Sequence, residues 1–386
     1  MDYQATTPVD PRVLDVMMPW FTERFGNAAS GHSFGWMAKE AVDQARREVA
    51  ELIGAGPREI IFTSGATESN NLSIKGVAEA YIKKGRHIIS CATEHKAVLE
   101  PLKYLIVHGW DVTWLKVDKQ GMIDLDELAA AFRDDTVLVT LAAANNEIGV
   151  IHPLAEIGQL ARDHGALFHV DAAQGFGKFP LDVAAMNIDL MSISGHKVYA
   201  PKGIGALYLR RRNPRVRPAP LFHGGDQEEG MRSGTHDVPS IVGLGRAAIL
   251  AGEEMDGEAE FLPGLRARFL AGLREGLAGI HLVGHPRKRL PGNLNIAFDD
   301  LEGDALRMSL RTLAVSSGSA CTFASVDPSH VLLALGFDPQ RAQSCLRFGF
   351  GRFSTEEETD RAMKMVIEAV RKVRGADPER MGQNAP

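Results

Sequence analysis

The sequence predicts an α/β fold built around a mostly parallel sheet. From residue 59 onward, short apolar runs alternate with helical segments, and polar residues gather where several of the runs end. The apolar runs are 59–63, 87–91, 111–117, 137–142 and 166–170. Because this alternation is typical of βαβ units, we expect helices on both faces of the sheet and ligands at the carboxyl ends of the strands.

Helices are expected at both ends of the chain. Pro11 would begin a helix over 10–25, which Gly26-Asn27 ends, and the apolar spacing predicts a second helix over 37–53. Between them, 27–36 is expected to be a loop of small residues. A last helix is predicted over 355–373, followed by a polar tail.

Composition excludes several classes of protein. The net charge of −6 argues against a nucleic-acid partner, and no apolar run reaches the roughly 18 residues of a membrane span. The segment MDYQATTPVD has no signal-peptide pattern. The three cysteines form no CxxC pair, which predicts a reducing compartment and no metal cage of cysteines alone. We therefore expect a cytoplasmic protein with 386 residues, enough for one large domain or two.

The strand at 59–63 leads into a candidate phosphate site. The loop TSGATE opens a helix expected to run to about residue 84, and a helix N-terminus preceded by small residues exposes N–H groups to an anion. The alternative is that Ser64 or Thr67 merely caps the helix. Taken by itself, this motif favours the cap.

Other predicted strand ends carry polar side chains. His95 follows 87–91 and could stack on an aromatic cofactor, while Asn146 follows 137–142. Asp171 ends the strand ALFHV, where a buried carboxylate needs a cation or several donors. A protonated pyridine nitrogen would be such a cation, and Gln174 could then reach the phenolic oxygen of the ring.

Lys197 is the candidate nucleophile. It follows the apolar run 189–193 in the turn Ser194-Gly195-His196-Lys197, and a further strand is expected at 205–209. An amine partly withdrawn from water loses proton affinity and attacks aldehydes, of which pyridoxal 5'-phosphate is the obvious one. Most lysines after strands are solvated, so the specific signal is the combination of features on consecutive strands.

Several segments of the chain resemble those of one family. They are DYQATTPVD, FGNAASGHSFG, FTSGATESNN, TEHKAV, NNEIG, HVDAAQ, SGHK, PKGIGALYLRR, GGDQEEGMRSGT, SSGSACT and LRFGFGRFSTEEE. From residue 2 to about 360, the chain resembles the pyridoxal-phosphate-dependent cysteine desulfurases, in the iron–sulfur-cluster and nitrogenase-type branch of the class V aminotransferase-like family.

This resemblance implies a pyridoxal-phosphate-dependent transferase of fold type I. A large domain over 11–250 would hold a mostly parallel seven-stranded sheet. A smaller α+β domain would combine 1–10 with 251–386. The resemblance also implies a homodimer.

The resemblance further implies roles for the residues at the cofactor ring. Lys197 would form the Schiff base, Asp171 would pair with the pyridine nitrogen and Gln174 would bond the phenolic oxygen. His95 would stack on the ring, and Asn146 would contact both the cofactor and the substrate.

The phosphate and the substrate would be held by further residues. The resemblance assigns the phosphate to Ala66, Thr67, Ser194 and His196. Thr235 would reach the phosphate in the other subunit's site, so the working unit would be the dimer. Arg347 would bind the substrate carboxylate, a bidentate task that suits a guanidinium, although a structural ion pair is the alternative for any single arginine.

The reaction that the resemblance implies depends on Cys321. It lies in SSGSACTFAS, whose small residues predict an exposed thiol in a loop, whereas Cys91 and Cys345 adjoin apolar strands and are expected in the core. In the family this position attacks the sulfur of bound L-cysteine and becomes a persulfide. Lys197 would remove the Cα proton, His95 would carry the proton of the substrate thiol, and alanine would be released.

The resulting prediction is a cysteine desulfurase. Sulfur from L-cysteine would pass through Cys321 to an iron–sulfur scaffold or another acceptor protein. No metal ligands are implied, and Cys321 would meet a cluster only through its persulfide. The alternatives are a selenocysteine lyase, a class V aminotransferase, or a weakly active sulfur-relay or assembly partner. The acceptor itself stays open among housekeeping, nitrogenase-specific and tRNA-thiolation proteins.

Overall fold

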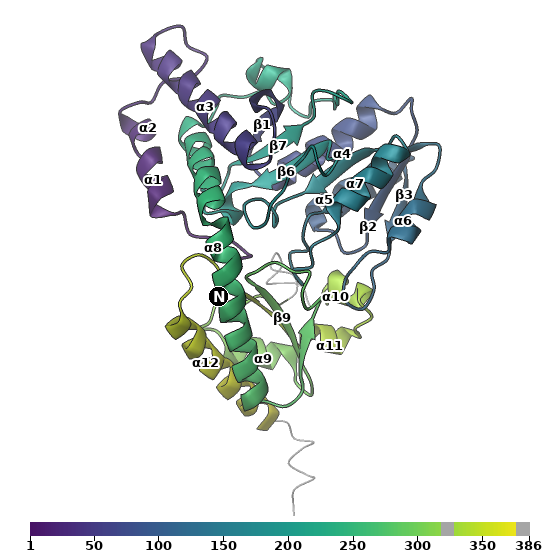
Figure 1. The fold of residues 1–386 in the computed structure, drawn as a ribbon, viewed down its shortest axis with the longest axis vertical. Coiled ribbons are helices and arrows are strands. Elements are labelled where there is room, and N and C mark those ends of the chain that lie inside the picture. Colours follow the sequence, from purple (N-terminus) through teal and green to yellow (C-terminus); the bar gives the residue numbers. More distant parts are fainter. Residues whose placement is uncertain (318–327, 376–386) are drawn as a thin grey trace, which may run out of the picture.

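A computed structural model describes residues 1–317 and 328–375. Its largest feature is a seven-stranded sheet with strand order β1-β7-β6-β5-β4-β2-β3, flanked by helices (Figure 1). The strands are β1 Ile60–Thr63, β2 His87–Cys91, β3 Asp111–Leu115, β4 Thr136–Ala142, β5 Leu167–Asp171, β6 Leu190–Ser194 and β7 Gly205–Leu209. Each lies within two residues of its predicted position.

The sheet is mostly parallel, as predicted. Strands β3, β2, β4, β5 and β6 pair in parallel, whereas β7 is antiparallel to both β6 and β1. The parallel strands therefore end at one edge, the edge that carries the candidate site.

Helices cover both faces of this sheet. The connecting helices are α4 Ala66–Ala80, α5 Lys96–Val107, α6 Leu125–Ala131 and α7 Leu154–Asp163. Strand residues alternate between two cores: in β7, Ala206 and Tyr208 pack in the core that includes α7, while Leu207 and Leu209 pack in the core that includes α4 and α5. The helix expected to run to residue 84 ends at Ala80.

The N-terminal helices differ from the prediction. The single helix expected over 10–25 is wrong: α1 Pro11–Met17 and α2 Pro19–Thr22 replace it. Pro19 cannot donate a backbone hydrogen bond within a continuing helix, so it begins a new one. The next helix, α3 Ser33–Leu52, begins four residues earlier than expected, because the His32 side chain caps it by accepting from the Gly35 N–H.

A long helix, α8 Val238–Gly276, runs from the large sheet to a smaller antiparallel sheet (Figure 1). The smaller sheet has the order β10-β9-β8 and lies against its own apolar core. The elements of this part are β8 Ile280–Val283, β9 Asn293–Phe298, α9 Gly303–Ser309, α10 His330–Ala334, α11 Pro339–Gln343, β10 Cys345–Gly349 and α12 Glu356–Gly375. The last helix matches the prediction to within two residues at each end.

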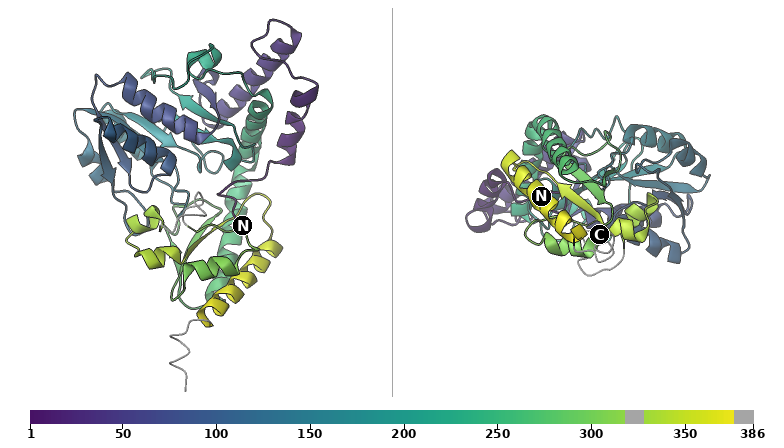
Figure 2. Two further views of the ribbon diagram at one scale, coloured as in Figure 1. Left: turned by 180° about the vertical axis from the view of Figure 1, so that it is seen from behind. Right: turned by 90° about the horizontal axis from the view of Figure 1, so that it is seen from below.

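The N-terminal segment lies beside this smaller sheet rather than beside the strands that follow it in sequence. Asp2 forms a parallel bridge to Gly349 at the end of β10, and both views in Figure 2 place the N-terminus next to the C-terminal part of the chain. Cys91 and Cys345 are buried free thiols, as expected. Within the described ranges, no helix has the length and apolarity needed to cross a membrane.

Candidate active site

A cavity of about 480 Å³ opens at the carboxyl ends of the central strands. It brings together nearly all of the predicted site residues, which lie at or just after the carboxyl ends of five strands of the large sheet, or on β10. Those that line it are Ala66, Thr67, His95, Asn146, Asp171, Gln174, Ser194, His196, Lys197 and Arg347. Most of the residues that the sequence analysis singled out therefore lie around one cavity.

The N-terminus of α4 forms one end of the cavity. The prediction that Ser64 or Thr67 caps this helix is wrong, because the N-cap residue is Gly65, which has no side chain to cap it. Ser64 instead donates its N–H to the Glu68 carboxylate. A Cβ on Gly205 would lie 2.6 Å from Gly65 Cα, so β7 approaches this loop only because Gly205 is a glycine. The first turn of α4 thus offers its N–H groups to an anion.

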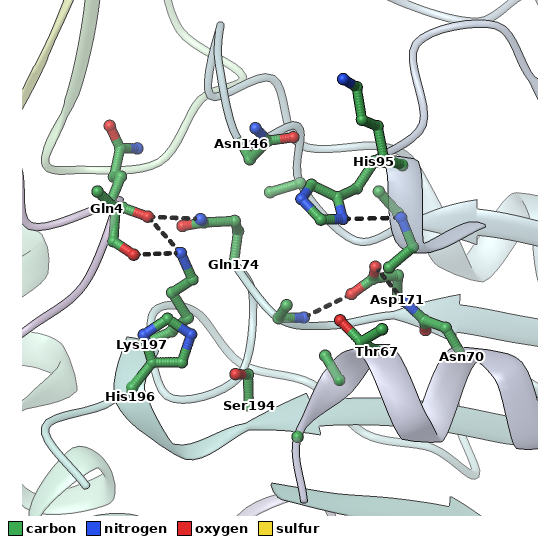
Figure 3. A pocket seen from close by; sticks show the side chains of 18 of the residues that line it. Gln4, Thr67, Asn70, His95, Asn146, Asp171, Gln174, Ser194, His196 and Lys197 are labelled. Atoms are coloured by element: carbon green, nitrogen blue, oxygen red, sulfur yellow. Dashed lines mark hydrogen bonds between the residues drawn. The ribbon is translucent and has the colours of Figure 1, made fainter. Parts of the chain in front are cut away.

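Asp171 is held at the end of β5 by two neutral donors. Its Oδ2 accepts from Asn70 Nδ2 at 2.7 Å and its Oδ1 accepts from the Ala173 N–H at 2.9 Å (Figure 3). Because both donors are neutral, they satisfy the carboxylate oxygens without bringing a positive charge, which leaves Asp171 suited to pair with a protonated ring nitrogen. Sequence reasoning missed Asn70, although a polar residue one turn beyond Thr67 on a buried helix face was a usable signal.

Lys197 ends the short 3-10 helix Gly195–Lys197 and points toward the N-terminal segment. Its Nζ donates to the carbonyl oxygens of Gln4 and Ala5, both at 2.7 Å, and Gln174 Nε2 donates to the same Gln4 oxygen at 3.0 Å (Figure 3). The sequence placed Lys197 and Gln174 at strand ends but gave no sign that residues 4 and 5 close this side of the cavity.

His95 caps α5 with its own side chain. Its Nδ1 accepts from the Ala97 N–H at 3.1 Å, so the neutral ring carries its proton on Nε2. Burial lowers the pKa of His95, Asp171 opposes this shift and Lys197 reinforces it. The imidazole is therefore a neutral ring that can donate a hydrogen bond from Nε2.

Arg347 lies on β10 and is 1% exposed. Its Nη1 donates to the Asn146 carbonyl at 2.7 Å, and its Nη2 donates to Asp2 Oδ1 at 2.9 Å and to Ser316 Oγ at 3.0 Å. Within the described residues, its buried Nε has no hydrogen-bond partner. The predicted pair of Arg347 and Asn146 is thus assembled, together with an acidic neighbour, Asp2, that sequence reasoning missed.

Two predicted residues do not join this cavity. Thr235 is exposed outside it, in a loop that the ion pair between Arg232 and Glu68 holds against the start of α4. Cys321 lies outside the described residues. Among the residues that are described, no group of three His, Cys, Asp or Glu side chains is placed to hold a metal ion.

The fold and the site define a pyridoxal-phosphate-dependent enzyme of fold type I. The uncapped helix, the carboxylate with neutral donors and the strand-end lysine fit the phosphate, the pyridine nitrogen and the aldehyde of this cofactor. The sequence profile of the aminotransferase class-V family matches residues 1–362. The chain belongs to this family, in the branch of cysteine desulfurases of the NifS and IscS type.

Curated relatives cover almost the whole chain. "Cysteine desulfurase IscS" of Anaeromyxobacter dehalogenans (strain 2CP-C) is 55% identical over 379 residues, which is 98% of this chain and 94% of the relative. A protein of the same name from Rickettsia peacockii (strain Rustic) is 52% identical over 379 residues, covering 98% and 92% of the two chains.

Solved structures agree with these relatives. A "NifS-like protein" superposes with a TM-score of 0.90 at 39% identity and covers 96% of this chain and 98% of its own. "SspA in complex with cysteine" superposes with a TM-score of 0.81 at 39% identity, covering 92% and 99%.

Proposed function

We propose that the protein is a pyridoxal-phosphate-dependent cysteine desulfurase that converts L-cysteine to L-alanine and passes the sulfur to an acceptor. The observation that carries this proposal is the convergence of Lys197, Asp171 and the pair of Arg347 and Asn146 on one cavity. Relatives at 55% identity bear the same activity in their names.

The residues around the cavity suit the separate parts of the cofactor. When bound, pyridoxal phosphate supplies an electron sink for the charge that develops at the substrate Cα. The N–H groups at the start of α4, with Ser194 and His196, would hold the phosphate, and Asp171 would hold the ring through its nitrogen. Lys197 holds the cofactor and then moves the Cα proton at its Nζ.

Arg347 and Asn146 orient the substrate. Within the described residues, the buried Nε–H of Arg347 has no acceptor, and the Asn146 side chain lines the same cavity. Both can donate to an α-carboxylate, which would fix the Cα hydrogen relative to Lys197. His95 would stack on the ring, and its Nε2–H can donate a hydrogen bond.

The sulfur leaves through Cys321 in this proposal. Its thiolate attacks the substrate sulfur and becomes a persulfide, which an iron–sulfur scaffold or another acceptor protein then receives. Because Cys91 and Cys345 are buried and burial raises the pKa of both thiols, to about 11 and about 12, neither is suited to that role. Free, unpaired thiols fit the reducing cytoplasm in which we place the protein.

We also propose that two copies form the working unit. Several large apolar side chains of α1, α2, α3 and the residues between these helices are 40–69% exposed; they are Leu14, Met18, Phe21, Phe25, Phe34, Trp36 and Met37. A second copy of the chain would bury this surface and bring Thr235 to the other subunit's phosphate. The division into 11–250 and 1–10 with 251–386 belongs to the same proposal, supported by the separate core around the small sheet.

The test is the release of alanine and sulfide from L-cysteine and dithiothreitol, with no other protein added. We expect Cys321→Ala to abolish turnover while the absorbance of the bound cofactor is retained, and Cys91→Ala, a matched change of a buried thiol, to keep turnover. Undiminished turnover in Cys321→Ala would favour an aminotransferase or a lyase. Turnover of selenocysteine with little of cysteine would favour the lyase, and no turnover by the wild-type protein would favour a relay protein.

A further inference from the structure

A second imidazole lines the same cavity as His95. His330 is the first residue of α10 and contributes to the cavity wall. The residue before it, Ser329, fixes this end of the helix by donating its hydroxyl to the Glu147 carboxylate and accepting from the Leu332 N–H at 3.2 Å. The hydrogen bonds of Ser329 therefore fix the backbone position from which the His330 side chain extends.

The tautomer of His330 follows from its partner. Its Nε2 lies 2.9 Å from the backbone carbonyl oxygen of Glu94, and a carbonyl oxygen can only accept a hydrogen bond. Nε2 must therefore carry the proton, which leaves the lone pair on Nδ1. His95 has the opposite arrangement, because its Nδ1 is used in accepting from the Ala97 N–H. Of these two rings, His330 has the nitrogen that can take up a proton.

The surroundings of His330 keep this lone pair available. Burial lowers the pKa of His330; the hydrogen bond to the Glu94 carbonyl opposes this shift, and the positive charges of Lys96 and Lys103 on α5 reinforce it. His95 lines the same cavity, and burial lowers its pKa as well. The ring is thus neutral at physiological pH.

Two buried carboxyl groups complete this environment. Burial raises the pKa of Glu94 to about 8 and that of Glu147 to about 7. Glu94 meets His330 through its backbone carbonyl, and Glu147 meets α10 through Ser329. Neither carboxyl group is hydrogen-bonded to the His330 ring in the described residues, so Nδ1 is not committed to a structural ion pair.

We propose that His330 is a catalytic residue that takes the proton from the thiol of bound L-cysteine at Nδ1 and returns it to Cβ of the departing alanine. The inference rests on the proposed desulfurase function. The S–H and Cβ–S bonds break, and the S–S bond to the attacking thiolate and a Cβ–H bond form. The persulfide keeps the negative charge of that thiolate, so protons and electrons balance without another reactant.

This assignment separates the tasks of the two histidines. His95 donates a hydrogen bond from Nε2, while His330 transfers the proton. The family resemblance implied that His95 carries this proton; the present proposal assigns the transfer to His330 because the backbone occupies Nδ1 of His95.

His330→Gln is the variant that tests the proposal. A glutamine amide can still donate to the Glu94 carbonyl, so the structural hydrogen bond is kept, but it cannot take up a proton. We expect kcat/KM for L-cysteine to fall by about 10²-fold. The absorbance change on adding L-cysteine should persist, because the cofactor and carboxylate sites are untouched. His108→Gln, at the exposed residue that follows the last turn of α5, should leave kcat/KM unchanged.

The pH profile separates catalysis from positioning. In the wild-type protein, activity should fall on the acid side as Nδ1 becomes protonated, and this limb should be absent from the residual activity of His330→Gln. Wild-type turnover in His330→Gln, or a slow variant that keeps the acid limb, would overturn the proposal. Failure of the wild-type protein to release alanine would instead overturn the proposed function.

A measurement on the wild-type protein tests the proposal even if the variant does not fold. Nitrogen-15 chemical shifts of the His330 ring distinguish the two neutral tautomers. A proton on Nε2 agrees with the proposal, and a proton on Nδ1 contradicts it whatever the variant does.

Discussion

At the scale of single residues, the site is governed by contacts with the N-terminal segment. Asp2 pairs with Arg347, while the backbone carbonyls of Gln4 and Ala5 accept from Lys197. The side chains that would meet the substrate and the cofactor thus already have hydrogen-bond partners in residues 2–5, and Arg347 has an ionic one. A substrate carboxylate has to share Arg347 with a carboxylate of the protein.

Asp2→Asn should strengthen binding of the substrate carboxylate. The asparagine keeps a hydrogen-bond acceptor for Ser316 but removes the charge that neutralises Arg347, so KM for L-cysteine should fall about threefold and inhibition by L-alanine should become tighter. Steady-state kinetics with and without added alanine measure both effects. Asp15→Asn, the same change at an exposed position of α1, is the control, and an unchanged or higher KM in Asp2→Asn would show that Asp2 does not compete.

At the scale of elements, the buried carboxylate of Glu228 connects α3, strand β1 and the loop before α8. Glu228, in the 3-10 helix Gln227–Gly230, accepts from both terminal nitrogens of Arg46 on α3 at 2.7 Å and from the Phe62 N–H on β1 at 3.0 Å. It also meets His236 Nε2 at 2.6 Å, next to Thr235. Glu228 therefore ties the loop that carries Thr235 to the strand that leads into the phosphate site.

The stability contributed by Glu228 should depend on pH. Burial raises its pKa, but hydrogen bonds from Arg46 and His236 outweigh burial and lower the pKa to about 2. A folded-state pKa below the unfolded value stabilises the protein above the unfolded pKa, and that stability is lost as pH falls from about 4.3 towards 2. Glu228→Gln should therefore lower the free energy of unfolding by about 3 kcal/mol at pH 7 and by clearly less at pH 3.

Urea unfolding at the two pH values measures this effect. Glu229→Gln is the matched control, because its side chain is 62% exposed and its ion pair with Arg211 lies at the surface. Equal losses for Glu228→Gln at pH 7 and pH 3 would contradict the role of its ionised form.

At the scale of the whole molecule, the exposed apolar surface of α1 to α3 is the feature that a single chain does not explain. Phe25 is 69% exposed and Trp36 is 64% exposed. By contrast, the large apolar side chains that the strands of the large sheet place on its two faces are mostly buried. Burial of such side chains against a second copy would be favourable. The exposed position of Thr235 outside its own cavity agrees with the same arrangement.

The double variant Phe25→Glu with Trp36→Glu should be monomeric. Charges on this surface oppose its burial, and without the partner's Thr235 the affinity for pyridoxal phosphate should fall about tenfold. Light scattering gives the mass, and titration of the cofactor gives the affinity. Val107→Glu, at an 83% exposed position on α5, should remain a dimer with unchanged affinity. A dimeric double variant, or a monomeric wild-type protein, would refute the proposed interface.

Much of the site followed from local sequence patterns. Alternating apolar runs located the strands, and His95, Asp171 and Lys197 were found because they follow those runs. Parallel strands end at one edge of a sheet, so predicting the strands also predicted which side chains meet. The helix expected over 10–25 was wrong because apolar spacing continues through Pro19 although a backbone donor is lost there.

The sequence by itself determined the strands, the residues at their ends and, through its motifs, the family. Only the tertiary structure decided which groups those residues contact: Asn70 at Asp171, Asp2 at Arg347, and the Glu94 carbonyl at His330. These partners are separated by 101, 345 and 236 positions, so no local pattern relates them. Charge compensation and histidine tautomers depend on such contacts, and they appear only when the folded chain brings distant donors and acceptors together.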